Sequence, residues 1–247
     1  MRNALTRRRL LSRAVSAAFL PTFGILPAAC SSRWALLPPR PVDWTMKPLS
    51  SAKVDERVFA DGHIELTIEH ALLRGVTPAM LVWWWRNIEG EMEFKGEEYP
   101  RYLIWHPIDH IHFAVAERLA DGSVGVGSTL HVVEALGADM RHLVDVLLHL
   151  RELDETGAAA EVHVLGRRVM RLHGAFLAEP EGTRVTTTMT LGGTGWGGRL
   201  GLNKLIDWFF PADRRKAWIK HSVEEIGNLE FFLPQLYGRH ASATVPA

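Results

Sequence analysis

The chain contains a single cysteine, Cys30, among its 247 residues. One cysteine cannot form a disulfide within the chain, so the fold has no internal covalent cross-link. A cysteine-rich zinc site is excluded for the same reason. Any metal ion held by the folded part of the chain must therefore be bound by histidines and carboxylates.

The chain also has no net charge, with 28 Lys and Arg against 28 Asp and Glu. The charge is unevenly placed, because residues 1–29 hold five arginines and no acid. Removing those five leaves 23 basic against 28 acidic residues, a net charge of −5 for residues 30–247. Such a body has no electrostatic reason to bind nucleic acid.

No internal repeat is present, and the one glycine-rich stretch, LGGTGWGGRLG at 191–201, lacks the Gly-Lys-Ser/Thr of a phosphate-binding loop. A mobile lid and a plain linker are both compatible with it. The length and the 47% apolar content indicate one large or two small globular domains.

No apolar run is long enough for a comfortable membrane span. The arginine-rich start is followed by an apolar stretch that Pro21, Gly24 and Pro27 interrupt, which predicts an export signal over 1–29. Residues 6–11 (TRRRLL) resemble a twin-arginine signal, which exports folded proteins. An ordinary secretory signal with extra arginines is the alternative.

Cys30 follows Ala28 and Ala29, as the lipidated cysteine follows the cleavage site of a bacterial lipoprotein. Pro27 departs from that pattern, and a small-residue cleavage site with an incidental cysteine is the alternative. The lipoprotein interpretation predicts membrane association through Cys30, in the periplasm or cell envelope. Residues 30–50 are rich in proline and predict a tether or surface strap, so a single folded domain is expected over 51–240.

The remaining patterns predict an α+β domain, in which a curved antiparallel sheet surrounds a long C-terminal helix with a cavity between them. Strands are expected at 63–72, 111–115, 124–134, 161–165, 167–178 and 183–191, and helices at 78–88, 139–152 and from Pro211 to about residue 236. The helix at 78–88 carries three successive tryptophans, which either pack in the core or partly line a ligand cavity.

The last helix carries His221 and Glu225, one turn apart, within an apolar stripe that includes Trp218, Leu229 and Phe232. Ionisable groups are costly to bury unless they are paired. A buried His–Glu hydrogen bond and half of a metal site are both compatible with this pair.

Two further candidate ligands are His106, in the loop WHPIDH at 105–110, and Glu134, at the end of an apolar strand face. Together with His221 and Glu225 they form a set suited to zinc and less to manganese or iron. His173, on an expected strand, either lies in the wall of the sheet or faces the cavity.

The WHPxDH motif, the strand ending in Glu134 and the sequence HSVEE at 221–225 resemble the 2,4-diacetylphloroglucinol hydrolase family, which includes phloretin hydrolase. The resemblance covers residues 60–237. It implies a helix-grip fold, similar to the birch pollen allergen and START domains. It also implies hydrolysis of the carbon–carbon bond between an acyl group and a phloroglucinol-type ring. The zinc ligands that it implies are His106, Glu134, His221 and Glu225.

The resemblance also implies catalytic roles for Tyr99, Asp109 and His173. Asp109 occupies the place of a family asparagine, which exchanges a hydrogen-bond donor for an acceptor and leaves the substrate open. A small aromatic ketone would be cleaved in a retro-Claisen hydrolysis, with zinc activating the carbonyl and a water. Alternatives are a non-enzymatic carrier lipoprotein of the same fold, which needs no buried acids, and a purely structural metal site.

Overall fold

The computed structural model describes residues 33–193, 198, 201 and 203–243. The expected export signal and Cys30 lie outside the described residues, as does part of the glycine-rich stretch. Among the described residues, no helix is both long enough and apolar enough to span a bilayer.

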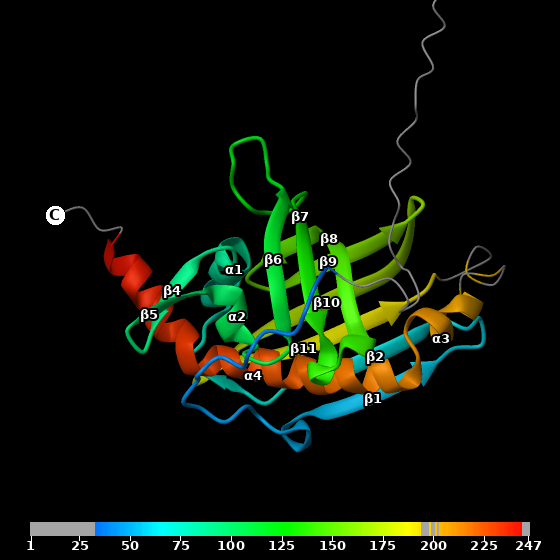
Figure 1. Ribbon diagram of the computed structural model, residues 1–247, viewed down its shortest axis with the longest axis horizontal. Helices are drawn as coiled ribbons and strands as arrows, with labels where there is room; N and C mark the ends of the chain where they lie inside the picture. Colours follow the sequence, from blue (N-terminus) through cyan, green and yellow to red (C-terminus); the bar gives the residue numbers. More distant parts are fainter. Residues whose placement is uncertain (1–32, 194–197, 199–200, 202, 244–247) are drawn as a thin grey trace, which may run out of the picture.

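One antiparallel sheet forms most of the domain, in the order β1-β2-β11-β10-β9-β8-β7-β6, with the short β3 also paired to β11 (Figure 1). Its strands are β1 (Lys53–Val58), β2 (Ile64–Glu69), β3 (Leu73–Arg74), β6 (His110–Glu117), β7 (Thr129–Ala135), β8 (Leu143–Asp154), β9 (Gly157–Val164), β10 (Arg167–Glu179) and β11 (Gly182–Leu191). Alternate residues of β2 and β11 face inward, as in Leu66 and Ile68 of β2, which are fully buried.

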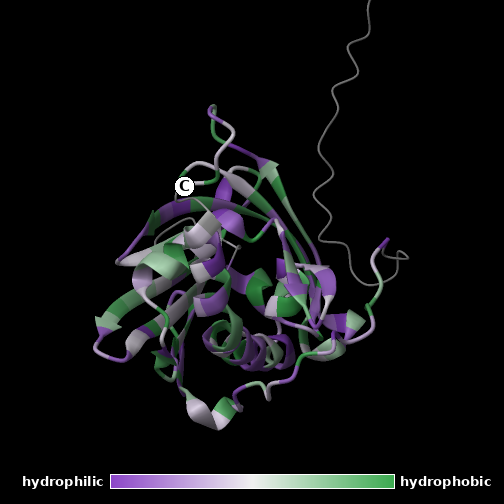
Figure 2. Ribbon diagram, turned by 90° about the vertical axis from the view of Figure 1, so that its left-hand side faces the viewer, coloured by the Kyte–Doolittle hydropathy of each residue, from purple (hydrophilic) through white to green (hydrophobic). Residues whose placement is uncertain are grey.

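The long helix α4 (Ala212–Ala243) lies inside the curve of this sheet. Figure 2 views α4 nearly end-on and shows the strands arching over it. The helix-grip fold expected from the sequence is therefore confirmed. The smaller elements are α1 (Pro78–Asn87), β4 (Glu91–Phe94), β5 (Glu97–Pro100), α2 (Arg101–Trp105), α3 (Ile206–Phe209) and short 3-10 turns at Leu49–Ser51, Leu136–Ala138, Met140–His142 and Asn203–Leu205.

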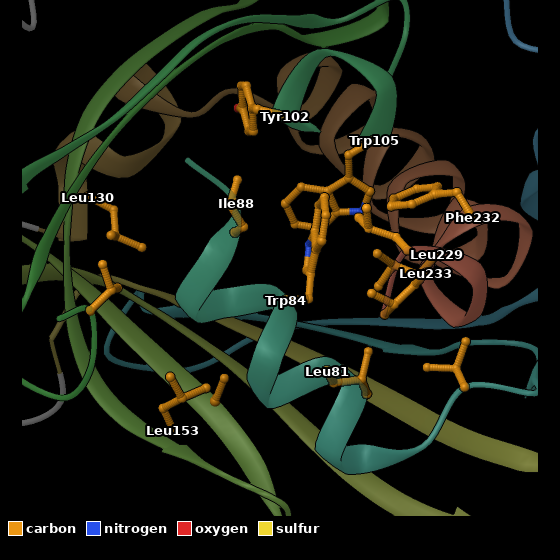
Figure 3. Close-up of a cluster of buried hydrophobic side chains, with 14 of the residues drawn as sticks. Leu81, Trp84, Ile88, Tyr102, Trp105, Leu130, Leu153, Leu229, Phe232 and Leu233 are labelled. Carbon is orange, nitrogen blue, oxygen red and sulfur yellow. The ribbon is translucent and has the colours of Figure 1, made fainter. Parts of the chain in front are cut away.

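Helix α1 begins as its sequence predicts, because the Thr77 side chain accepts a hydrogen bond from the amide of Met80 and Pro78 is the first helical residue. Its tryptophans have different roles. Trp84 is fully buried and packs edge-on against Trp105 and Phe232 (Figure 3). Trp85 instead lines the cavity described below, so the tryptophan run supplies both core and cavity wall.

The helix expected at 139–152 is wrong, because this segment forms a 3-10 turn followed by the strand β8. Its apolar residues fit a helical period only because Leu143 and Leu147 add apolar side chains on the outer face of the sheet. The inner positions Leu148 and Leu150 alternate as a strand requires. Hydrogen bonding to β7 on one side and β9 on the other fixes this conformation.

Helix α4 extends to Ala243, beyond the end expected near residue 236, although Pro234 lies within it. A proline inside a helix removes one backbone hydrogen bond. The last turns nevertheless pack against α1, where Trp83 contacts the rings of Tyr237 and His240. This tertiary packing explains why the proline does not end the helix.

The proline-rich stretch lies across the surface as a strap. Trp44 stacks on Phe231 and Phe232 of α4, and its indole N–H donates to the side chain of Asn228. Trp34, near the start of the described chain, donates its indole N–H to Asp145 of β8. The strap therefore connects the long helix to the outer face of the sheet.

Candidate metal centre

Four ionisable side chains converge between the sheet and α4: His110, Glu134, His221 and Glu225. Their nearest nitrogen and oxygen atoms all lie within 4.8 Å of one another. The fold explains the convergence, because His110 and Glu134 are directly paired across β6 and β7, and His221 and Glu225 are one turn apart on α4. His221 Nε2 lies 2.7 Å from one oxygen of Glu134 and 2.7 Å from one of Glu225.

The two histidines are held in the orientation that metal ligation needs. His221 directs Nδ1 to the carboxylate of Asp109 at 2.9 Å, and His110 directs Nδ1 to the carbonyl oxygen of Tyr102 at 2.6 Å. An Nδ1 that donates to a fixed acceptor leaves the Nε2 lone pair for a metal ion. Both Nε2 atoms face the two glutamates.

The hydrogen bonding at the centre is incomplete in a way that a cation would complete. His110 Nε2 is buried without a hydrogen-bond partner, and one oxygen of Glu134 lies 2.7 Å from His221 Nε2 without the geometry of a hydrogen bond. Such incomplete pairing is costly in a protein interior. Two imidazoles and two carboxylates form a donor set typical of zinc and related divalent ions. The residues therefore fit a metal ion.

The charges of the centre favour a cation as well. Burial alone would raise the pKa of Glu225, but the neighbouring imidazoles of His110 and His221 lower it to about 2. Burial likewise opposes a charge on His221, yet the neighbouring Glu134 and Asp109 raise the pKa of that imidazole well above its usual value. The surrounding carboxylates thus attract positive charge to this point, as a proton on His221 or as a metal ion.

His106 was expected among the four ligands, and the structure puts His110 in that place instead. His106 Nδ1 accepts a hydrogen bond from the amide of Asp109, so the ring proton is on Nε2. That Nε2 lies 3.4 Å from Glu224 and 3.8 Å from Asp109. Burial lowers the pKa of His106, which keeps the ring neutral with this single proton. His106 lies outside the four-residue centre and instead forms a second group with Asp109 and His221, whose candidate ligand atoms lie within 4.8 Å of one another.

On a helical wheel Glu224 lies away from the apolar stripe of α4, yet the structure buries it. Its carboxylate accepts hydrogen bonds from Lys220, one turn earlier, and contacts His106. The helix wheel missed this contact because the loop that carries His106 covers a second side of α4.

Asp109 has a positioning role in the structure. Its carboxylate accepts from the amides of Gly137 and Ala138, both at 2.9 Å, and from His221. Burial would raise the pKa of Asp109, but the His221 hydrogen bond and the nearby imidazoles lower it far below its usual range. Asp109 is not among the residues that line the cavity, and its contacts fix the orientation of the His221 ring.

An apolar cavity of about 90 Å³ lies next to the four-residue centre. Its polar end is formed by Glu134, His221 and Glu225. The other walls are mainly apolar and include Trp85, Ile88, Trp105, Phe113, Val132, Leu148, Leu150, the alanines 158–160, Leu172, Gly174, Phe176, Val185, Trp218 and Ile226. A cavity of about 150 Å³ is the size that admits benzene in other proteins, so a phenolic ring would require some side chains to move.

Tyr102 is the tyrosine at the cavity, and the expected Tyr99 is not. Tyr102 stacks face to face on His110, with the two ring centroids 3.7 Å apart. Its hydroxyl is buried without a hydrogen-bond partner. Burial, and then the charge of Glu134, raise its pKa well above the usual value. Tyr99 lies on β5 and donates to Glu97 instead. Both tyrosines lie in the same aromatic-rich stretch of the sequence. Only the helical turn of α2 determines that Tyr102, and not Tyr99, lies at the cavity.

His173 lies on the outer face of β10, away from the cavity. Its side chain is 37% exposed and 3.8 Å from Glu152, whereas the adjacent Leu172 and Gly174 line the cavity. Of its two expected placements, the wall of the sheet is the one observed.

His70 was missed by the sequence analysis. It follows β2 on the inner face, is 3% exposed, and its Nε2 lies 2.9 Å from the hydroxyl of Thr187, which lines the cavity. The sequence feature that could have revealed His70 is its spacing from Ile64, Leu66 and Ile68, because every second residue of a strand faces the same side.

Solved structures similar to this chain include protein Ms6760 from Mycobacterium smegmatis, which is 12% identical, with 72% of this chain and 97% of that chain covered and a TM-score of 0.41. Protein NE0264 from Nitrosomonas europaea is 14% identical, with 73% and 99% covered and a TM-score of 0.40. TTHA0849 from Thermus thermophilus is 13% identical, with 74% and 99% covered and a TM-score of 0.39. No curated protein matches the chain.

Residues 57–164 match the family model described as the DAPG hydrolase PhiG domain. The matched segment includes Tyr102, His110 and Glu134, and it ends before α4, which supplies the other two groups of the centre. A DAPG hydrolase domain indicates a hydrolase that acts on phloroglucinol-type compounds. The match supports the assignment of residues 57–164 to the DAPG hydrolase family.

Proposed function

We propose that the protein is a zinc-dependent hydrolase that cleaves the carbon–carbon bond between an acyl group and a phloroglucinol-type phenolic ring. One observation carries this proposal above all others: two imidazole Nε2 atoms and two carboxylates converge at one end of an apolar cavity. Apolar walls suit an aromatic ring, and the polar end suits a carbonyl oxygen and a metal ion.

Zinc is the metal that the donor set favours, because mixed imidazole and carboxylate ligands without cysteine are typical of hydrolytic zinc sites. The residues that would hold it are His110, Glu134, His221 and Glu225, with Asp109 and the Tyr102 carbonyl as the outer partners of the histidines. When bound there, zinc would supply Lewis acidity to the acyl carbonyl and to a water molecule.

The cavity walls would orient the substrate and exclude bulk water. With the acyl group at the polar end, the ring would lie among Ile88, Trp105 and Phe113. An apolar surrounding favours the neutral keto form of the ring over a charged phenolate. That keto form is the one from which the carbon–carbon bond can break.

Tyr102 would provide the proton that the reaction requires. In a retro-Claisen hydrolysis, water adds its oxygen to the acyl carbon, the bond to the ring carbon breaks, and the bonding electron pair remains on the ring carbon. The ring carbon then takes up a proton, which yields the free phenol and a carboxylic acid. The Tyr102 hydroxyl is buried, protonated and without a partner beside the centre, so it is placed to donate to the oxygen or carbon on which charge develops.

A non-enzymatic carrier with the same fold is the competing function, and metal content together with product formation distinguishes the two. The test compares the wild type with Glu225→Ala and with a control, Glu230→Ala, whose carboxylate on the same helix pairs with Lys47 away from the centre. The wild type and the control should contain zinc and release acetate and phloroglucinol from acetylphloroglucinol. Glu225→Ala should do neither.

Two results would contradict the proposal. Equal zinc stoichiometry in wild type and Glu225→Ala would remove Glu225 from the centre. A wild type that binds acetylphloroglucinol without metal and without releasing acetate would be a carrier.

We also propose export by the twin-arginine route and lipidation at Cys30, on the basis of residues 1–30 alone. Uptake of labelled fatty acid by the wild type and its absence in Cys30→Ser would support the lipid anchor. Equal labelling of the two proteins would overturn it.

A further inference from the structure

The cavity walls contain a hydroxyl group that lies outside the four-residue centre. Thr187 faces the cavity from β11, whereas Glu134 faces it from β7, and three strands separate these two in the curved sheet. The walls around Thr187 are apolar, with Val185 on its own strand and Leu172, Gly174 and Phe176 on β10. A substrate that reaches from the centre to this wall therefore meets a hydroxyl there.

His70 holds this hydroxyl in place. The backbone amide of His70 donates to the carbonyl of Val185, and its imidazole Nε2 lies 2.9 Å from Thr187 Oγ1. The two side chains are diagonal neighbours on the inner face, the geometry in which side chains of adjacent strands interact. His70 is 3% exposed, and its Nδ1 is buried without a hydrogen-bond partner. A buried polar group with an unsatisfied nitrogen is costly, so packing alone does not explain a histidine at this position.

A threonine hydroxyl can both donate and accept a hydrogen bond, and the contact with His70 uses only one of these two roles of Thr187. If His70 Nε2–H donates to Oγ1, the hydroxyl hydrogen of Thr187 can be donated into the cavity. If the hydroxyl donates to Nε2, its oxygen still accepts a hydrogen bond from the cavity. In both tautomers the Thr187 hydroxyl can bind one polar atom of a ligand.

We propose that Thr187, positioned by His70, binds a ring hydroxyl of the substrate that lies away from the acyl group. This inference rests on the proposed function and deepens it, because it assigns recognition of the ring hydroxyl opposite the acyl substituent to Thr187. The acyl group lies at the metal centre, the ring lies between the apolar walls, and the distant hydroxyl contacts Thr187. Thr187 is then a specificity residue and His70 is a positioning residue.

The test measures binding, so it does not depend on turnover. The purified protein is treated with EDTA and titrated with two probes, while the fluorescence of the cavity tryptophans is followed. One probe is acetylphloroglucinol, with hydroxyls at both ortho positions and at the para position, and the other is its analogue without the para hydroxyl. The wild type should bind the first about fivefold more tightly, the effect of one neutral hydrogen bond.

Three variants distinguish loss of the contact between Thr187 and the ring hydroxyl from a general loss of structure. Thr187→Val keeps the shape, removes the hydroxyl, and should bind both probes equally. Thr187→Ser keeps the hydroxyl and should restore most of the preference. His70→Leu should reduce the preference while the circular dichroism spectrum is unchanged, because the hydroxyl is present but no longer oriented.

The inference is overturned if Thr187→Val keeps the wild-type preference, or if the wild type binds both probes equally. Its failure is distinct from failure of the proposed function. Equal binding of the probes by a protein that contains zinc and releases acetate would overturn only the role of Thr187. Binding of neither probe would overturn this inference together with the substrate class.

Discussion

Histidines lie on both faces of the curved sheet, and their partners differ between the two. On the inner side, His106, His110 and His221 are almost fully buried and form hydrogen bonds with fixed backbone or carboxylate groups. Those of the outer face are His112, His131, His149, His163 and His173, which pair with surface carboxylates or with one another. His131, for example, lies 2.7 Å from Asp145, which also accepts from Trp34.

The comparison teaches that the partner of each ring nitrogen, and not the number of histidines, identifies a metal centre. His110 and His221 each have Nδ1 engaged and Nε2 directed at carboxylates. An outer histidine such as His173 has a carboxylate nearby and solvent around it, and exposed pairs of this kind contribute little. If this is correct, substitutions on the two faces should have very different effects.

The largest effect is expected for His110→Ala, compared with His173→Ala on the outer face. Loss of a ligand should reduce the zinc content to near zero and lower kcat/KM by more than about a thousandfold. His173→Ala should keep the metal and nearly all activity. Elemental analysis and an acetate-release assay measure the two quantities. Equal zinc content in the two variants would contradict the assignment of His110.

The second effect compares an inner and an outer tyrosine. Tyr102→Phe removes the buried hydroxyl, and kcat should fall by about 10² to 10⁴, the range for a proton donor, with zinc content unchanged. Tyr99→Phe removes a hydroxyl that contacts Glu97 away from the cavity, and its kcat should stay near that of the wild type. A similar kcat for both variants would show that Tyr102 is not the proton donor.

The variant His106→Gln tests whether His106 binds the metal ion itself or only stabilises the residues that bind it. His106 contacts Glu224 and Asp109, and Asp109 in turn orients His221. Loss of such outer partners weakens metal affinity by about 10- to 100-fold. At saturating zinc the variant should still bind one ion per chain, with a weaker Kd in competition with a chelator. Complete loss of zinc at saturation would restore His106 as a ligand.

The sequence predicted most of the fold and three of the four converging groups. Residue spacing revealed the inner face of β7 and the His221–Glu225 pair. It could not choose between His106 and His110, which lie four residues apart. That choice depends on the Asp109 amide, which engages Nδ1 of His106, and on the Tyr102 carbonyl, which engages Nδ1 of His110. Such contacts form only when the loop and β6 are folded.

The strand β8 is a second element that the sequence alone could not predict correctly. Its outer face carries Leu143, which packs against the same small apolar cluster as Trp34 of the strap, and the exposed Leu147. Apolar residues on both faces conceal the period of two that marks a half-buried strand. The helix was predicted there because the strap that covers part of the outer face is distant in sequence.

Adjacent positions on β10 provide a smaller test of the two faces. Gly174 lines the cavity, and a Cβ there would lie 3.4 Å from the ring of Phe176. Gly174→Val should fill part of the cavity and weaken binding of acetylphloroglucinol at least about tenfold, since a valine side chain displaces ligand volume. His173→Val, on the outer face of the same strand, should leave the Kd unchanged. Tryptophan quenching in EDTA measures both, and equal Kd values would exclude this wall from the binding site.

The last effect concerns stability and not activity: it is the contribution of His70 to the pH dependence of unfolding. Burial lowers the pKa of His70 from 6.5 to about 4. Between these values the unfolded chain binds a proton at His70 and the folded protein does not, so the free energy of unfolding rises with pH across this window. The full difference corresponds to roughly 3 kcal/mol, reached above pH 6.5 and absent below about pH 4. Urea unfolding in EDTA should show a shallower rise for His70→Leu, and parallel curves for the two proteins would mean that His70 is not held neutral beside the cavity.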